Sequence, residues 1–350
     1  MNKKNLKKFI FLMIIILTFF ILSCSSESIF SQLSKLQKIN NKNNTLDSAS
    51  PSGISLVNDT LYIAAMHLFK KENGKVEKVN FNNSYEFVLD LVNVSGTTYL
   101  LVQNKNGQLE LYTLQNNNWI LKLKKDDLIA IKFLKSITTS GISSAYILAL
   151  EETGKQIILD LNGNNQTPSG TTNNDKFYQL SNDNNMSITG SFSKIWELQG
   201  GRKVINVNST NAIMAIIETN IRGFKETLVI TGKEYDNTSD NQFKIYSSTN
   251  HYQSPIFNYE GIGEFTSYFA REVNGVILIG SNSGFVELVK DKNTFTLQPP
   301  SQSVLSGSYN GSQLSKTKLN DIIPISNNII YILTQGKGLW KVENKKLTKE

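Results

Sequence analysis

The sequence predicts an all-β protein, a β-propeller of about seven four-stranded blades, although six or eight blades also fit its length. The clearest unit is Asp321–Lys349, where short β-rich runs alternate with Asn-Asn, Gly-Lys-Gly and Glu-Asn-Lys turns. β-Branched and aromatic residues favour strands, whereas Asn and Gly tolerate the positive φ of hairpin turns. Gly53–Lys78 repeats this pattern near the start of the chain. A four-stranded unit that recurs along a chain is typical of a propeller.

The two terminal units also match residue by residue. Tyr62 aligns with Tyr331, and Phe69 aligns with Trp340. We therefore expect the first and last blades to meet and close a ring, which leaves only short strand edges exposed. A pair of β-sandwiches is the alternative fold, but it would not require matched units at both ends.

Residues 1–23 are predicted to be a lipoprotein signal peptide. Four lysines precede an apolar run, Phe9–Leu22, that is shorter than the ~20 residues of a membrane-spanning helix. The run ends in Ile-Leu-Ser-Cys at Cys24, which resembles the bacterial lipobox with Ile in place of the preferred Leu. The resemblance implies cleavage before Cys24 and attachment of lipid, including fatty acids such as palmitate, to that residue. A plain signal anchor with an incidental cysteine is the alternative.

Residues 24–50 are predicted to form a lipidated tether, because they are rich in Ser, Asn and Lys. Apolar residues recur within it at helical spacing: Ile29, Phe30, Leu33, Leu36 and Ile39. A short amphipathic helix here would dock on the membrane or a partner, or it would pack on the propeller or fray. Pro51 ends any helix, so that residues 51–350 form the propeller domain.

Within this domain most strands follow from apolar runs between turn residues. The second and third units contain Leu89–Val92, Thr98–Val102, Leu109–Leu114, Trp119–Leu121, Ile131–Leu134, Ala145–Leu150 and Gln156–Leu161. The clearest interior repeat contains Phe265–Glu272, Gly275–Gly280, Phe285–Lys290 and Thr294–Leu297. Strands between residues 176 and 260 recur without a clear grouping into blades. Polar segments at 162–175, 236–241 and 299–316 are predicted to be long loops and are the candidate contact regions.

The sequence contains few of the residue types that commonly carry out catalysis. A single cysteine allows no disulfide within the chain, and His67 and His251 are the only histidines. No catalytic or phosphate-binding motif is present. Asp160 begins a run that imitates half of a calcium loop, but position six is Asn165 and position twelve is Thr171, so the bidentate glutamate is missing. We therefore predict no catalytic residue, no cofactor and no metal site.

A sugar-cleaving propeller would need acidic residues that converge at the channel mouth. The available acids are Asp90, Asp126, Asp127, Glu151, Glu152 and Asp321. Trp119 and Trp340, which occupy equivalent positions in our alignment of the repeats, are expected to pack between blades instead of stacking on sugars.

Charge argues against nucleic acid as a partner. The formal net charge is +7, but four of these charges are lysines within the first 23 residues. The remaining charge is too small and too dispersed for a nucleic-acid-binding protein.

The lipobox, the tether and the repeats together resemble exported propeller lipoproteins of Gram-negative-type bacteria. The Asn-, Lys- and Ile-rich composition is similar to that of spirochaetal ones, and the nearest functional analogue is the BamB-like lipoprotein of outer-membrane β-barrel assembly. The resemblance covers the chain from Cys24 to its end. The BamB-like Ala-x-Asp-x-x-Thr-Gly-x-x-x-Trp signature is absent, so no partner-contacting residue carries over.

This resemblance implies a lipid-anchored protein of the cell envelope, in the outer membrane, with the periplasmic face and the cell surface both open. Its expected function is that of a protein-interaction scaffold, accessory to barrel assembly, and not of an enzyme. The alternatives are a surface-exposed lipoprotein that binds a host or environmental ligand, and a carbohydrate-active enzyme.

Overall fold

A computed structural model describes residues 46, 48–81, 85–138, 141–182, 187–190, 194–198, 205–207, 212–220, 223–232, 243–259, 267–273, 275–281, 284–291, 294–298 and 313–350. Asn41–Glu350 forms one compact unit that contains every strand. The predicted signal peptide, Cys24 and the tether up to residue 45 lie outside the described residues, as do the loop at 236–241 and most of the loop at 299–316.

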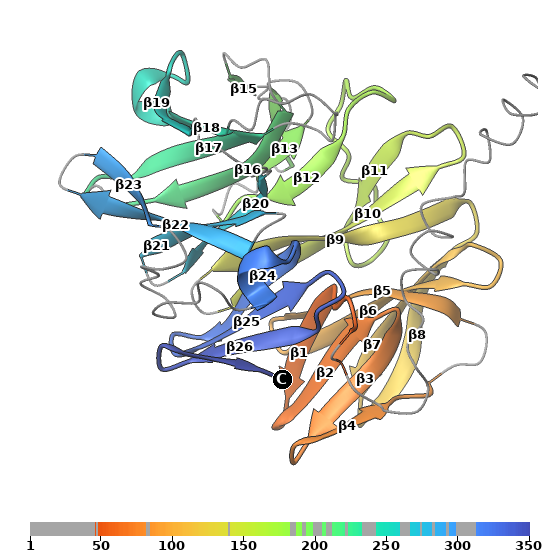
Figure 1. Cartoon of the computed structure of the whole chain (residues 1–350). Coiled ribbons are helices and arrows are strands. Elements are labelled where there is room, and N and C mark those ends of the chain that lie inside the picture. The colour runs from red at the N-terminus through yellow and green to blue at the C-terminus, as the bar shows by residue number, and fades with distance from the viewer. Residues whose placement is uncertain are drawn as a thin grey trace, which may run out of the picture. The chain divides into compact units, whose positions relative to one another are not determined.

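The strands form seven antiparallel sheets, six with four strands and one with three (Figure 1). The first three sheets are β1 (Gly53–Val57), β2 (Thr60–Ala65), β3 (His67–Glu72) and β4 (Lys75–Lys78); β5 (Tyr85–Val94), β6 (Thr97–Asn104), β7 (Leu109–Gln115) and β8 (Asn118–Lys125); and β9 (Leu128–Thr138), β10 (Gly141–Glu151) and β11 (Gln156–Leu159). In every sheet, strands that follow each other in the chain pair with each other.

The remaining four sheets each have four strands. They are β12 (Phe177–Leu180), β13 (Ser187–Gly190), β14 (Lys194–Glu197) and β15 (Ile205–Asn206); β16 (Ala212–Thr219), β17 (Glu226–Gly232), β18 (Phe243–Ser247) and β19 (Pro255–Tyr259); β20 (Ser267–Val273), β21 (Val276–Ser281), β22 (Gly284–Asp291) and β23 (Thr294–Gln298); and β24 (Leu319–Ser326), β25 (Ile329–Thr334), β26 (Leu339–Glu343) and β27 (Lys346–Lys349). The structure thus groups the strands between residues 176 and 260 into two blades, which the sequence had left ungrouped.

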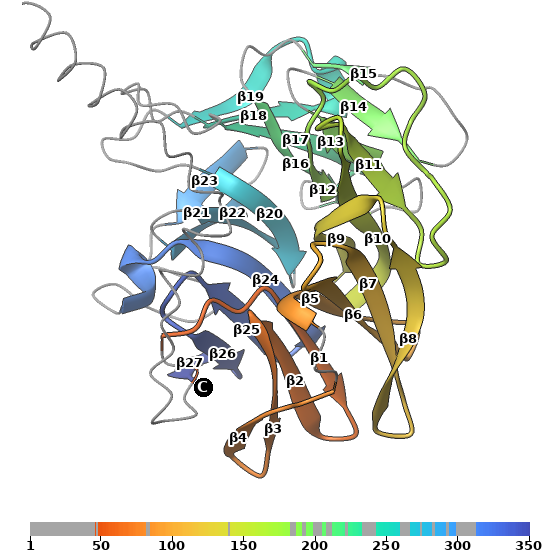
Figure 2. The ribbon, with the colours of Figure 1, turned by 90° about the vertical axis from the view of Figure 1, so that its right-hand side faces the viewer.

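The first strands of successive sheets lie side by side and form a ring. β1 contacts β5, β5 contacts β9, and the series continues through β12, β16, β20 and β24, which returns to β1. Figure 2 shows these strands at the inside of the sheets and strands such as β4 and β8 at the rim. The prediction of an all-β propeller with mostly four-stranded blades is confirmed.

The third sheet has three strands, as the three apolar runs of this unit indicated, and so departs only from the general expectation of four-stranded blades. The chain after β11 turns back at Asp160 and covers the outer edge of β11 irregularly. The Gln166 amide donates to the Ile158 carbonyl over 2.7 Å, and the Ile158 amide donates to Thr167 Oγ1 over 2.9 Å. The segment is rich in Asn and Gly and lacks the alternating apolar residues of a strand. Part of the predicted contact loop at 162–175 therefore has a structural role.

The ring closes where the chain enters the first blade. Residues 49–52 run along the last blade, and the Gly338 amide donates to the Ala49 carbonyl over 3.0 Å. Asn320 Nδ2 donates to the Pro51 carbonyl over 2.9 Å. The first and last blades are therefore neighbours, as the matched terminal units predict.

The two terminal hairpins also share their backbone conformation. Asn73 and Gly74 have φ values of 49° and 78°, and Asn344 and Lys345 have φ values of 49° and 63°. The Trp119 alignment is wrong, however, because Trp119 lies on the fourth strand of its sheet and Trp340 on the third. The described part of the chain contains no helix with the length and hydropathy of a membrane span.

Candidate functional site

Two innermost strands carry an aspartate at the same structural position. Asp90 in β5 and Asp321 in β24 each follow a break in the pairing register with the next strand. Asp90 Oδ1 accepts a hydrogen bond from the Leu91 amide over 2.8 Å, and Asp321 Oδ1 accepts one from the Ile322 amide over 2.9 Å. A β-bulge can redirect a side chain. We therefore attribute the inward direction of both carboxylates to these bulges.

Lys135 of β9 joins the two aspartates. Its Nζ lies 2.7 Å from Asp90 Oδ1 and 3.8 Å from Asp321 Oδ2. Arg271 of β20 binds Asp321 through Nε at 3.1 Å and Nη2 at 3.3 Å. We call Asp90, Lys135, Arg271 and Asp321 the central ion cluster. Its members come from four different sheets, and none is more than 7% exposed.

Further hydrogen bonds partly compensate for the burial of these charges. Asp90 Oδ2 accepts from the Phe133 amide over 3.0 Å, and Lys135 Nζ donates to the Ser52 carbonyl over 3.1 Å. Burial raises the pKa of Asp90, whereas Lys135 and the backbone amides of Phe133 and Leu91 act in the opposite direction. Burial outweighs these donors and the pKa of Asp90 is raised, but the hydrogen bonds to Phe133 and Lys135 still link β5 to the neighbouring β9.

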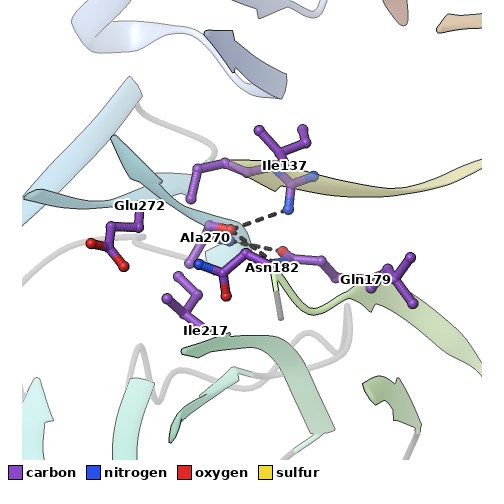
Figure 3. Close-up of a pocket in the computed structure, with 8 residues that line it drawn as sticks. Ile137, Gln179, Asn182, Ile217, Ala270 and Glu272 are labelled. Atoms are coloured by element: carbon purple, nitrogen blue, oxygen red, sulfur yellow. Dashed lines mark hydrogen bonds between the residues drawn. The ribbon is translucent and has the colours of Figure 1, made fainter. Parts of the chain in front are cut away.

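Gln179 adds amide clamps beside the central ion cluster. Its Nε2 donates to the Ala270 carbonyl over 3.0 Å and its Oε1 accepts from the Ala270 amide over 3.1 Å, so that β12 is fixed to β20 (Figure 3). Asn182 similarly donates to the Glu218 carbonyl over 3.0 Å and accepts from its amide over 2.7 Å. Lys132 donates to a backbone carbonyl of β12, and desolvation lowers the pKa of Lys132 to about 8.

A small recess lies next to these clamps. Ile137, Asn182, Ile217 and Glu272 are among the residues that line it (Figure 3). Burial raises the pKa of Glu272, and a hydrogen bond from Thr219 opposes this effect. The recess has no free volume for a water molecule, whereas pockets for small molecules typically measure ~300–1,000 Å³, so it cannot hold a sugar or a cofactor.

The six acidic residues that were considered for sugar cleavage lie in different parts of the structure. Asp90 and Asp321 do converge, but each is bound by a cation and buried. Asp126 and Asp127 lie in the turn between β8 and β9, Glu151 is the last residue of β10, and Glu152 lies in the turn that follows it. Asp126 pairs with the exposed Lys124 over 3.0 Å. Two carboxylates that are neutralised by lysine and arginine do not resemble the acid and nucleophile pair of a glycosidase.

Sequence reasoning missed Lys135 and Arg271, because no local motif marks either residue. Asp90 and Asp321 had a usable signal, since each precedes two aliphatic residues in the first strand of a repeat.

The calcium-like run at Asp160 forms a turn. Asp160 Oδ1 accepts from the amides of Asn162 and Asn164 over 2.8 and 2.9 Å, and Oδ2 accepts from Asn164 Nδ2 over 2.8 Å. Desolvation alone would raise the pKa of Asp160, but these hydrogen bonds outweigh it and the pKa is lowered. Among the residues that the structure describes, no three His, Cys, Asp or Glu side chains are placed to hold a metal ion.

The two histidines lie apart from the central ion cluster. His67 is half-buried on β3, its ring centroid is 6.2 Å from that of Tyr85, and its Nδ1 has no hydrogen-bond partner among the described residues. Burial, and then the positive charge of Lys78, lower the pKa of His67. His251 is exposed and has a φ of 55° at the end of the short 3-10 helix Ser248–Asn250.

Comparison with known proteins identifies a close relative. No family model matches the chain. A protein of Borreliella burgdorferi, described as uncharacterized, is 58% identical over 337 residues, which cover 96% of this chain and 95% of that protein.

Two solved structures share the fold. YCF48 bound to a D1 peptide matches 85% of this chain and 94% of its own, with a TM-score of 0.55 and 10% identity. The virginiamycin B lyase from Staphylococcus aureus matches 85% of this chain and 95% of its own, with a TM-score of 0.54 and 9% identity.

Lys135→Met is expected to lower the free energy of unfolding by ~3–5 kcal/mol, because Asp90 would be left buried without its cation. Urea unfolding followed by circular dichroism measures the change. Lys124→Met, at an exposed ion pair, serves as the control and should cost less than ~0.5 kcal/mol. A loss below ~1 kcal/mol at Lys135 would contradict a structural role for the central ion cluster.

His67 makes the stability depend on pH. Well above pH ~6.5 its imidazole is neutral in both the folded and the unfolded chain, so it adds no pH dependence to the free energy of unfolding. Because its folded-state pKa is lowered, the unfolded chain binds the proton more readily, and the free energy of unfolding should fall as the pH drops below 6.5. His67→Gln should lose part of this decrease between pH 7.5 and pH 5, whereas His251→Gln should keep it. Identical pH profiles for the parent and His67→Gln would refute the assignment.

Proposed function

The chain belongs to the same family as the Borreliella burgdorferi protein, and we propose that it is a lipid-anchored propeller that binds a protein partner in the cell envelope. One observation carries the binding part of this proposal. The centre of the ring, where a propeller can accommodate a ligand, is filled by the central ion cluster and the amide clamps. The surfaces that remain for a partner are the rigid outer faces and the loops, and these are suited to binding a macromolecule.

The lipobox supports the anchoring part. Basic residues, an apolar run and the single cysteine of the chain coincide at Cys24. Two or more acyl chains would give stable attachment to a bilayer. Attachment to the outer membrane follows from the resemblance to propeller lipoproteins, and both of its faces are compatible with the sequence.

A finer proposal is that the partner belongs to the machinery of outer-membrane β-barrel assembly. It is supported by the architectural resemblance to BamB-like lipoproteins, which combine a lipid anchor with a propeller. The solved structures with a similar fold include a peptide complex and a lyase, so the fold alone does not decide between binding and catalysis.

Cys24→Ala is expected to abolish stable attachment to membranes, because it removes the acceptor of the acyl chains. Phase partition with detergent measures this directly: the parent should enter the detergent phase, and the variant should remain unprocessed or be released. If the variant entered the detergent phase as a processed protein like the parent, lipidation at Cys24 would be wrong.

Binding to a protein partner is tested by amine-reactive crosslinking in intact cells, followed by mass spectrometry. We expect reproducible crosslinks from surface lysines to one envelope protein, a barrel-assembly component in the finer proposal. The exported Cys24→Ala variant, which keeps the propeller, is the control and should lose crosslinks to a membrane partner. The absence of any protein partner, together with turnover of a glycan by the purified chain, would overturn the proposal.

A further inference from the structure

β8 differs from the other outermost strands in length. It spans eight residues, whereas the fourth strands of the other sheets, β4, β15, β19, β23 and β27, span two to five. Natural propellers and sandwiches keep such edges short, because an unpaired row of amides and carbonyls is a template for another strand. β8 therefore offers an edge long enough to pair with a further strand.

The outer edge of β8 has no strand partner among the described residues. Its pairing is with β7, from Leu109 opposite Lys125 to Gln115 opposite Asn118. Figure 2 shows β8 at the rim of its sheet, on the side away from β5. The loop at Gly163 approaches the side chains of Leu123 and Lys125 in the second half of the strand, whereas Asn118, Ile120 and Leu121 in the first half are exposed.

The first half of β8 exposes aliphatic side chains. Ile120 is 46% exposed and Leu121 is 48% exposed, and they are the one adjacent pair of exposed large hydrophobic residues in the part of the chain that the structure describes. In the pairing with β7, Ile120 is opposite Thr113 and Leu121 is opposite Tyr112, so they lie on the two faces of the blade. A strand added at this edge would cover both residues.

The second half of β8 is basic. Lys122, Lys124 and Lys125 lie on the strand, which has no acidic residue. The Lys122 ammonium is 5.0 Å from the centre of the Tyr99 ring, and Lys124 pairs with Asp126, which lies in the turn beyond the strand. Two β8 strands from separate copies would bring six lysines and no acid together, which disfavours a dimer through this edge.

We propose that β8 is the docking edge for an extended segment of the partner protein, with apolar residues that cover Ile120 and Leu121 and acidic residues that face the lysines. The segment adds a fifth strand to the second blade. Backbone hydrogen bonds supply affinity, and the alternating side chains supply specificity. This inference rests on the proposed function and names the chemistry of the partner.

The test uses the full chain, purified in a mild detergent, and two blocked ten-residue probe peptides. One peptide alternates valine with glutamate, and the other alternates valine with lysine. Fluorescence anisotropy measures the dissociation constants, and hydrogen exchange reports the outward amides of β8. We expect the acidic peptide to bind more tightly than the basic one and to slow exchange along Asn118–Lys125.

Variants on the exposed edge then locate the site. Ile120→Lys with Leu121→Lys should weaken binding of the acidic peptide about tenfold or more, because it removes the two apolar side chains that the valines of the peptide would cover. Lys122→Glu with Lys124→Glu should reverse the preference between the two peptides. Phe224→Lys, at a residue that is 47% exposed on another blade, is the matched control and should leave the affinity within about twofold.

The inference is wrong if neither peptide protects β8, or if the Ile120 and Leu121 variant binds like the parent. It is also wrong if β8 becomes protected without peptide, either by self-association or on vesicles of phosphatidylglycerol and phosphatidylethanolamine. Cellular crosslinks that persist in the Ile120 and Leu121 variant would contradict the docking edge and leave the scaffold function intact. If the parent itself gave no crosslinks to any protein partner, that result would instead contradict the scaffold function.

Discussion

The ammonium of Lys135 holds the centre of this propeller together. It contacts Asp90 and Asp321, which belong to the second and the seventh sheet, and it also donates to the backbone just before the first. Burial of an ionised group costs several kcal/mol unless partners compensate, so all three side chains depend on one another. Arg271 extends the same dependence to the sixth sheet. The ring is therefore fixed from its inside by charge as well as by apolar packing between blades.

This use of the central strands determines where binding can occur. Side chains that could have lined an open channel are instead committed to pairing, and the remaining recess is small. Residues 49–52 tie the last blade to the first, so the end of the predicted tether is itself part of the ring closure. If the chain is lipid-anchored, any pull on the anchor acts on that closure. The outer edges and loops are the surfaces left for a partner, and β8 is the longest of those edges.

Much of the fold was predictable because it is encoded locally. Alternating apolar residues and Asn or Gly turns marked most strands, and Tyr62 and Tyr331 do occupy the same position of the second strand in their sheets. The central ion cluster was not predictable, because Lys135 and Arg271 meet their aspartates only after four sheets have assembled. The run that begins at Trp119 was correctly placed fourth in its unit, but its alignment with Trp340 was wrong by one strand, since an aromatic residue in a short apolar run fits the third or the fourth strand equally well. The three strands of the third blade were also marked locally, because three apolar runs are followed there by the polar segment at 162–175.

The most direct test is a double-mutant cycle between Asp90→Asn and Asp321→Asn, with the free energy of unfolding measured in urea. Each single variant leaves Lys135 one carboxylate, whereas the double variant leaves its buried ammonium with none. A cluster that acts as one unit predicts that the double variant loses at least ~1 kcal/mol more than the sum of the two single losses. Losses that add within ~0.5 kcal/mol would show that the two aspartates act independently and would contradict the account.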